Sequence, residues 1–503
     1  MRTSKTNLFV FLALLFTCSA ANAADVSFTV DCKTNYGSIS PYVFGYNTSG
    51  LYYSSPTINL NQIVINKLKE AGITMLLFPP GSPANRYDFK YNNYKGRHYP
   101  GSGTSWTTTV PSIEDELRFC NAVGAEPLIK VNTAFIGPNG TGTGEGSTNM
   151  YSDDFAGYAG VTLPDNAVNR AQYAADMVTH VRQLCNTYGW KYPVYYEIGN
   201  EWRWNGVTRS TYAVLFEEYS KAMKAVDPNI KLLLGCDERA TYNSIIPSMA
   251  ARNIVPDIHN YHIYAQYRGG GNPLVVYCPG TTDGTFTSLI QPFVSANFYN
   301  VVSHTTDYYK QYYPSYTGDI KLAVSEWGDD ASSDTYRIDP YTKAMYSGHM
   351  LFRMIQNKFV ISAPWSMWSE LATSSNSSHK LFGAPPDFLP RPAFFTYKIY
   401  RNFGDTLVKC TDPIPGDSML MQASVRGSTV AAIMAINLST NTVYNAQITV
   451  SGFDDMSGIV DVYTMNQSNC CDGGPGPSTT TLTGQTGLIT HTFQPYTITC
   501  LVF

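Results

Sequence analysis

Two glutamates have the residue type and the local setting needed for acid–base and nucleophilic chemistry. Residues 194–198 are β-branched and aromatic, as is typical of a buried strand, and a Gly-Asn-Glu motif ending at Glu201 follows them. Residues 322–324 form a second apolar segment, which leads into a Ser-Glu-Trp motif centred on Glu326. A carboxylate at the end of a buried strand is costly unless it is paired or used. Either glutamate alone could form an ordinary ion pair, but two in the same setting favour a joint role.

Hydrolysis of a glycosidic bond needs this kind of pair. One carboxylic acid protonates the leaving oxygen while a second carboxylate attacks the anomeric carbon or activates water. In the retaining mechanism the two carboxyl groups lie about 5–5.5 Å apart, and a covalent glycosyl-enzyme forms. The sequence therefore predicts that folding brings Glu201 and Glu326 together across one sugar ring.

The elements that must position them alternate between strand and helix. Segments of the two kinds follow one another through residues 34–404, and the two glutamate motifs end the fourth and seventh predicted strands. Such alternation predicts an α/β fold, a (β/α)8 TIM barrel whose active site lies at the carboxyl ends of its strands. Ser112 before three acidic residues is typical of a capped helix within this barrel.

The chain ends are expected to build a second, smaller domain. Residues 405–503 contain short strands separated by turn residues, which predicts an all-β sandwich, and the N-terminal strand at 24–33 is expected to join it. This domain could bind carbohydrate. The strands carry no row of aromatic residues, however, so a packing role is favoured.

The first 23 residues have the pattern of a secretory signal peptide. Arg2 and Lys5 precede an apolar run at residues 8–16, and Ala21-Asn22-Ala23 forms a small-x-small cleavage site. The run is too short to span a bilayer stably, and no later stretch is apolar for long enough. The sequence thus predicts a secreted protein, extracellular or periplasmic, with no membrane span.

Composition points to a neutral partner. The net charge of −4 offers no electrostatic reason to bind nucleic acid or an anionic membrane. Only 14% of residues are charged, whereas there are 37 Tyr and 7 Trp, a balance that suits stacking and hydrogen bonding to a carbohydrate. No metal-binding or nucleotide-binding motif is present, so neither a metal nor a cofactor is expected.

The two glutamate motifs, in this order and spacing, resemble those of clan A retaining glycoside hydrolases built on (β/α)8 barrels. Within that clan the chain is most similar to the α-L-arabinofuranosidase and β-xylosidase families that carry a C-terminal β-sandwich. The resemblance covers most of the chain. It implies that Glu201 is the acid/base, that Glu326 is the nucleophile, and that Asn200 binds the 2-hydroxyl group of the sugar.

Further residues are expected around the pair. His262 and Tyr264 lie two apart on the predicted sixth strand and should face the same way, His262 near the acid/base and Tyr264 bonded to the nucleophile. Asn85 resembles a sugar-contacting residue after the second strand, and Trp368 on the eighth is expected to stack on the sugar. His262 could instead be structural, and Trp368 could belong to the core.

Two residues are expected to support the site from behind. Glu197 lies deeper in the fourth strand and should contribute hydrogen bonds. The related families usually place an Arg before a Phe-Pro-Gly-Gly run on the second strand, where it helps to keep the nucleophile ionised, but this chain has Leu77 there. Arg86 is the nearest residue that could take its place.

The predicted function is exo-acting hydrolysis of plant-type polysaccharide or oligosaccharide, as an α-L-arabinofuranosidase or β-xylosidase. An endo-β-1,4-glycanase of glucanase, xylanase or mannanase type is the alternative, because aromatic segments at 91–106 and 134–158 could line an open cleft. A non-catalytic polysaccharide-binding protein is a third interpretation. The paired glutamates argue against it, since binding alone requires neither.

Overall fold

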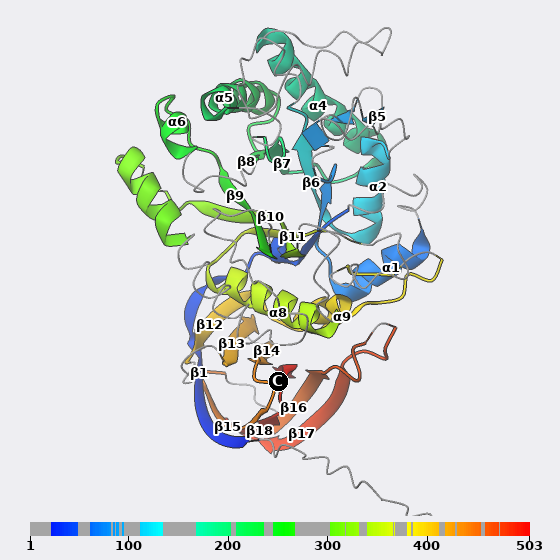
Figure 1. Ribbon diagram of the computed structural model, residues 1–503, viewed down its shortest axis with the longest axis vertical. Coiled ribbons are helices and arrows are strands. Elements are labelled where there is room, and N and C mark those ends of the chain that lie inside the picture. Colours follow the sequence, from blue (N-terminus) through cyan, green and yellow to red (C-terminus); the bar gives the residue numbers. More distant parts are fainter. Residues whose placement is uncertain are drawn as a thin grey trace, which may run out of the picture.

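The structure is a computed structural model in which a barrel stands above a β-domain (Figure 1). No helix among the residues it describes is long and apolar enough to cross a membrane. Those residues are 22–48, 61–81, 84–85, 87–89, 93–94, 111–133, 167–202, 208–235, 245–266, 302–316, 318–330, 340–365, 367, 380–383, 386–411, 418–427, 430–453, 458–471 and 473–503.

In the described part of the chain, eight parallel strands form the barrel. In spatial order they are β2 (Gly45–Asn47), β3 (Met75–Phe78), β6 (Glu126–Val131), β7 (Tyr195–Ile198), β8 (Lys231–Leu234), β9 (Ile258–Gln266), β10 (Lys321–Asp330) and β11 (Ile361–Pro364). The last strand contacts the first, which closes the ring. The order in space is the order in sequence, as a (β/α)8 barrel requires, so the predicted fold class is confirmed.

Helices cover the outside of this ring (Figure 1). They are α1 (Gln62–Ala71), α2 (Ile113–Val123), α4 (Ala167–Tyr188), α5 (Arg209–Val226), α6 (Ile246–Ala250), the helical residues 302–312, α8 (Pro340–Gln356) and α9 (Pro392–Tyr400). Helix α2 begins as predicted, because Ser112 and Asp115 form a capping box that satisfies backbone N–H groups at its start.

The barrel interior changes character along its axis. Inward side chains near the amino ends of the strands are apolar and form one buried cluster, which includes Leu128 and Ile258. Two residues further on, the same strands carry Lys130 and Asn260, which are also buried. Side chains two apart on a strand face the same way, so a polar layer lies on top of the apolar one. That layer is at the carboxyl ends of the strands, where the catalytic residues are predicted.

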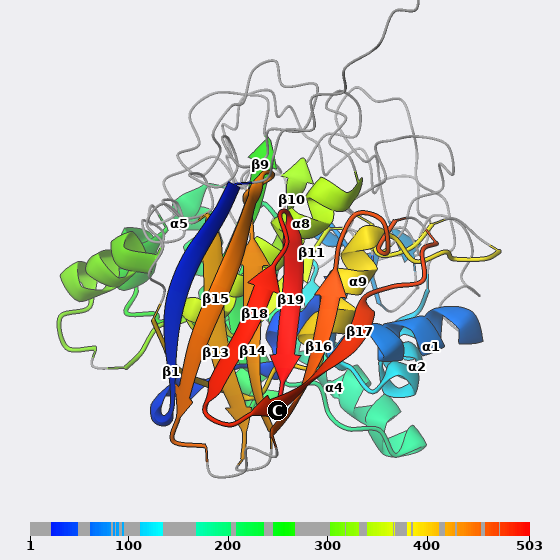
Figure 2. The same cartoon turned by 90° about the horizontal axis from the view of Figure 1, so that it is seen from below.

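Among the residues that the structure describes, the β-domain is one curved sheet of nine strands. Its members are β1 (Asn22–Ser38), β12 (Thr406–Cys410), β13 (Met419–Arg426), β14 (Val430–Asn437), β15 (Thr442–Ser451), β16 (Gly458–Met465), β17 (Ser478–Gln485), β18 (Leu488–Phe493) and β19 (Thr497–Val502). Strand β1 pairs in parallel with β15 and antiparallel with β12, and Figure 2 shows it beside β15. The predicted contribution of the N-terminal strand to this domain is therefore confirmed.

The two ends of strand β1 can be compared with two predicted boundaries, the end of the N-terminal strand and the cleavage site of the signal peptide. It runs on to Ser38, past the expected end at residue 33. Of the predicted signal peptide, residues 1–21 lie outside the described part of the chain, and Asn22 and Ala23 are the first residues of β1. Cleavage after Ala23 stays a prediction.

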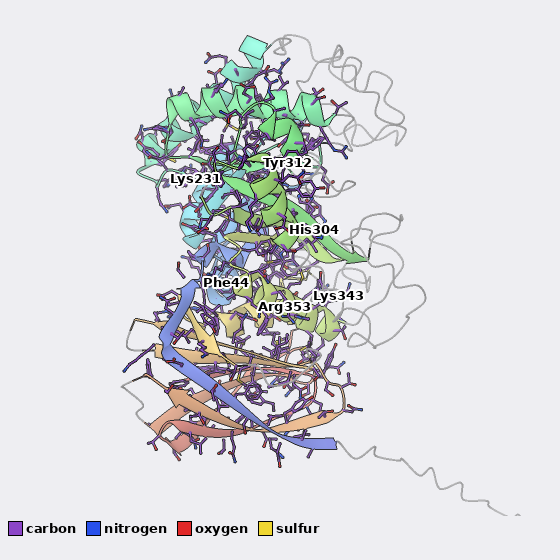
Figure 3. The ribbon with its side chains drawn as sticks, turned by 90° about the vertical axis from the view of Figure 1, so that its left-hand side faces the viewer. Phe44, Lys231, His304, Tyr312, Lys343 and Arg353 are labelled. Atoms are coloured by element: carbon purple, nitrogen blue, oxygen red, sulfur yellow. The ribbon has the colours of Figure 1, made fainter. Side chains whose placement is uncertain are left out.

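Helix α8 packs between the barrel and the β-domain, and Lys343 and Arg353 mark it in Figure 3. The hydroxyl group of Tyr341 on this helix donates to the backbone oxygens of Met465 (3.0 Å) and Tyr496 (2.9 Å) in the β-domain. The first contact is buried and the second partly buried, and both join the barrel helix to the β-domain.

Candidate active site

The turn after β7 presents Glu201. Gly199 has a φ of 75° and Glu201 a φ of 44°, the left-handed region that non-glycine residues seldom adopt. A Cβ atom on Gly199 would lie 2.7 Å from Cγ2 of Thr133, so the backbone passes too close to β6 for any other residue. The strained turn ends with the Glu201 side chain 14% exposed, at the barrel mouth.

A β-bulge in β10 presents Glu326. The pairing of β10 with β9 shifts between Val324 and Glu326, which leaves Ser325 as the extra residue. As a result two consecutive side chains reach the polar layer. Ser325 accepts a hydrogen bond from Asn260 Nδ2 (2.8 Å), while Glu326 lies beside His262. Without the bulge, one of the two would face the surrounding helices.

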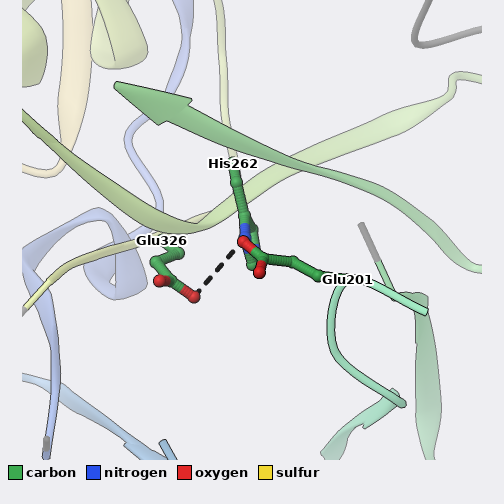
Figure 4. A group of neighbouring side chains, drawn as sticks. All are labelled: Glu201, His262 and Glu326. Carbon is green, nitrogen blue, oxygen red and sulfur yellow. Dashed lines mark hydrogen bonds and ion pairs between the residues drawn. The ribbon is translucent and has the colours of Figure 1, made fainter. Parts of the chain in front are cut away.

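The ring of His262 lies against both carboxylates (Figure 4). Its Nδ1 atom is 2.7 Å from Oε1 of Glu201 and 3.4 Å from Oε2 of Glu326, and a ring nitrogen of His262 and one carboxylate oxygen of each glutamate all lie within 4.8 Å of one another. A contact of 2.7 Å requires a proton, either on Nδ1 or on the Glu201 carboxyl group. His262 is thus placed to share a proton with the predicted general acid.

A lysine inside the barrel links the groups beneath. Lys130, the fifth residue of β6, is fully buried, and its Nζ donates a hydrogen bond to Oδ1 of Asn200. The same atom lies 3.8 Å from Oε1 of Glu197 and 3.9 Å from Oε2 of Glu326. One ammonium group therefore contacts three oxygen atoms of the candidate site.

Glu197 is buried in this layer and its titration is strongly altered. The pKa of Glu197 is raised to about 7, chiefly by burial, because the charged form loses its water, and to a smaller extent by the charge of Glu326. The ammonium of Lys130 and hydrogen bonds from Ser325 and Asn260 act in the opposite direction. Near neutral pH this side chain is therefore divided between its acid and its carboxylate.

Asn85 fixes the backbone of Asn200. Its Oδ1 accepts hydrogen bonds from the backbone N of Asn200 (2.8 Å) and from Oγ1 of Thr133 (2.6 Å). Its Nδ2 donates to the backbone oxygen of Asn200 (2.5 Å). The predicted sugar-contacting residue thus holds in place the residue that is predicted to bind the 2-hydroxyl group.

Trp202 anchors the turn from behind. Its buried ring stacks on Tyr212 at 4.5 Å, and Nε1 donates to the backbone oxygen of Gly235 (2.9 Å). The hydroxyl of Tyr212 donates to the backbone oxygen of Ile198 and accepts from the backbone N of Gly235, both at 2.6 Å. The end of β7 is thereby tied to the end of β8, which limits how far Glu201 can move.

The structure brings six of the predicted residues together: Glu201, Glu326, His262, Asn200, Asn85 and Glu197. Arg86, Trp368 and the side chain of Tyr264 lie outside the described residues. Leu77 is part of the apolar interior cluster, and the cation near Glu326 comes from the next strand. Lys130, Ser325 and Asn260 were not predicted.

The glutamate pair and His262 are also the group that could hold a metal ion among the residues the structure describes. Their closeness is already explained by the hydrogen bond between His262 and Glu201, so the geometry does not require an ion. That neither metal nor cofactor takes part stays a prediction.

Comparisons with known proteins agree with this picture. Residues 81–273 match the family model of the alpha-L-arabinofuranosidase 1 domain, a stretch that includes Lys130, Glu201 and His262 but ends before Glu326. No curated protein sequence matches the chain significantly.

Solved structures share the fold at low identity. The GH51 arabinofuranosidase from Xanthomonas axonopodis pv. citri is 15% identical, with a TM-score of 0.68 over 95% of this chain and 99% of that one. The GH51 alpha-L-arabinofuranosidase from Thermotoga petrophila RKU-1 is 17% identical, with a TM-score of 0.67 over the same shares. A family 44 xyloglucanase from Paenibacillus polymyxa is also similar, at 15% identity and a TM-score of 0.65 over 96% of this chain and 99% of that one.

These findings define a class. A barrel with a β-domain, a carboxylate pair at the barrel mouth and an arabinofuranosidase family match together support a glycosidase. The resemblance to the α-L-arabinofuranosidase families, inferred above from two short motifs, is confirmed by the family match and by the structural neighbours.

Proposed function

We propose that the chain is a secreted, retaining α-L-arabinofuranosidase that removes terminal sugars from plant-type polysaccharide or its oligosaccharides, with β-xylosidase as the nearest variant. The observation that carries the proposal is the spacing of the carboxylates. Facing oxygens of Glu201 and Glu326 lie within 4.8 Å, which suits double displacement. Inverting enzymes keep the pair about 6.5–9.5 Å apart to admit a water molecule.

The reaction would proceed in two steps. Glu326 attacks the anomeric carbon while Glu201 gives its proton to the leaving oxygen, and a glycosyl-enzyme ester forms. Glu201, now a carboxylate, then takes a proton from water, which attacks the same carbon and releases Glu326. Asn200 binds the 2-hydroxyl group, and this bond strengthens as positive charge develops on the ring. His262 exchanges the proton of Glu201 within a 2.7 Å contact.

Variants of the two glutamates test the proposal. Purified protein is assayed on p-nitrophenyl α-L-arabinofuranoside and β-D-xyloside. Glu326→Ala should lose essentially all turnover. Glu201→Gln should lose activity on natural linkages but react with the aryl glycoside when azide is added, because azide needs no base. Glu114→Ala, which removes a partly exposed ion pair with Arg118 and a hydrogen bond from the Tyr188 hydroxyl on the helical outside of the barrel, is the control and should be fully active.

Retention is read from methanolysis, in which the methyl glycoside formed should keep the configuration of the substrate. Normal activity of Glu326→Ala, or an inverted product, would refute the mechanism. A wild-type protein that binds polysaccharide without turnover would favour the non-catalytic interpretation. Export is tested by recovering the protein outside the cytoplasm, with a mature N-terminus at residue 24.

An endo-acting glycanase is the second candidate. It is supported by structural similarity to the xyloglucanase above and to a bifunctional glucanase-xylanase from a metagenome library, which is 16% identical with a TM-score of 0.65 over 96% of this chain and 99% of that one. Digests of arabinan, xylan, β-glucan and mannan separate the two, because an exo enzyme releases single sugars and an endo enzyme releases a ladder of oligosaccharides.

A further inference from the structure

We infer that Lys130 is a positioning residue of the candidate site, whose ammonium group holds Glu326 as a carboxylate and fixes the orientation of the Asn200 amide. The inference rests on the proposed function, which it deepens by one residue. Lys130 is fully buried within the barrel, and a buried lysine is retained only where other groups use its charge.

The groups around Glu326 favour a cation beside it. Among the described residues, the titratable groups that face it are Glu201 and Glu197 from the β7 end of the site, His262 from β9 and Lys130 from β6. Two of these are carboxyl groups, whose ionised forms oppose a further negative charge nearby, and His262 is cationic only when protonated. Lys130, 3.9 Å from Oε2 of Glu326, supplies a positive charge that offsets this repulsion.

The contact with Asn200 gives the second function. An ammonium group only donates, so it must meet the oxygen of the amide and not its nitrogen. With Oδ1 held by Lys130, the NH2 group of Asn200 is directed away from it and can donate to an acceptor such as the 2-hydroxyl oxygen of a bound sugar. Loss of the ammonium would free the amide to rotate, and the correct orientation would no longer be fixed before the substrate binds.

A purely structural role makes a different prediction. Glu197 lies 3.8 Å from Nζ, slightly closer than Glu326, and Lys130 could serve only to neutralise it. In that case Glu197→Gln would make Lys130 dispensable. If Lys130 acts on Glu326, removing it should affect the enzyme whether or not Glu197 carries a charge.

Four variants separate the two roles: Lys130→Met, Lys130→Arg, Glu197→Gln and the double variant Lys130→Met/Glu197→Gln. We expect Lys130→Met to lower kcat/KM by about 10²-fold, mainly through kcat, as expected for removal of one charged donor. The acid limb of its pH–rate profile should move to higher pH, and Lys130→Arg should restore most of the loss. Lys191→Met is the matched control, because Lys191 pairs with Glu126 at the opposite end of the same strand (2.8 Å).

A stability measurement keeps the test independent of activity. In a Glu197→Gln background, unfolding midpoints at pH 7 are measured for Lys130→Met, Glu326→Gln and both together. If the two groups interact, the combined loss differs from the sum of the single losses. If this measurement shows coupling between Lys130 and Glu326 but the wild type has no glycosidase activity, the proposed function is refuted, while the interaction between the two charges is still supported.

When Lys130→Met can be purified, either of two results would overturn the inference. One is additive losses in that cycle. The other is a folded Lys130→Met variant whose kcat/KM and acid limb equal those of the wild type or of Lys191→Met. A variant too unstable to purify is replaced by the double variant, in which the acid limb should still lie at higher pH than in Glu197→Gln alone. Identical profiles of those two proteins would assign Lys130 to Glu197 only.

Discussion

Replacing Gly199 with Ala should disable the candidate site through the backbone, without touching any charged group. The left-handed φ of 75° costs an L-residue about 1–2 kcal/mol. The new methyl group would lie 2.7 Å from Cγ2 and 2.8 Å from Oγ1 of Thr133, and overpacking of this kind costs about 1–3 kcal/mol more. We therefore expect a loss of about 2–5 kcal/mol in the free energy of unfolding.

Activity should fall as well, because Asn200 and Glu201 follow directly and Thr133 is bonded to Asn85. A displacement near 1 Å at the reacting groups lowers kcat by about 10²-fold. Urea unfolding and p-nitrophenyl glycoside turnover measure the two effects. Gly189→Ala is the control, since Gly189 has a φ of 69° but no atom within 4 Å of the added methyl group, and it should lose only the conformational part.

A second substitution that relieves the contact between residue 199 and Thr133 tests whether this contact causes the loss. Thr133→Ser removes Cγ2 and keeps the hydroxyl group that donates to Asn85, so it should recover part of the stability lost in Gly199→Ala. The reasoning fails if Gly199→Ala has the same urea midpoint as Gly189→Ala and keeps the kcat of the wild type. That result would show that the close approach of residue 199 to Thr133 does not position the turn.

Three further predictions follow from the polar layer. The pKa of Glu197 is raised from 4.5 to about 7, so between these pH values the folded protein keeps a proton that the unfolded chain releases. The free energy of unfolding should therefore fall by roughly 3 kcal/mol as the pH rises from 4.5 to about 7. Glu197→Gln should lack this decline in urea titrations, and an unchanged decline would assign it to another group. Ser325→Ala removes an acceptor of Asn260 and a 3.2 Å contact with Nε2 of His262, and should lower kcat with little change in KM, whereas a change in KM alone would place Ser325 in substrate binding. Dialysis against EDTA should leave kcat/KM unchanged, and a loss restored by a divalent cation would show that the three clustered ligands hold a metal.

The order of the barrel elements was predictable because each strand and helix has a clear local pattern. Strands buried on both faces are continuous apolar runs, and the helix at 113–123 has a capping residue and acidic first turn that define its start. Once eight strands alternate with helices, a parallel barrel follows, and with it the prediction that the strand-four and strand-seven glutamates share one end. No pairing had to be guessed, since spatial order and sequence order coincide.

The supporting residues were harder to predict because their roles depend on contacts between strands. Ser325 precedes Glu326, and strict alternation would place only one of them inward. A bulge that turns both inward leaves no mark in the sequence. Lys130 had a usable signal, namely a charged residue two positions after Leu128 on the inner face of a buried strand. A cation there is unfavourable without anionic partners, and the carboxylates of the next strand were the available candidates.

Strand β8 lacks a side chain at the level of the polar layer. Strand β8 contributes Leu233 to the apolar layer, where it pairs with Ile258 of β9, but two residues later, at the level where β9 carries Asn260, it has Gly235. A Cβ atom at that position would lie 2.5 Å from the backbone oxygen of Ile198, so a side chain would prevent the turn after β7 from folding over the end of β8. The turn occupies this space, and Trp202 bonds to the Gly235 oxygen. The acid is thus placed by an absent side chain on one strand, as the nucleophile is placed by an extra residue on another.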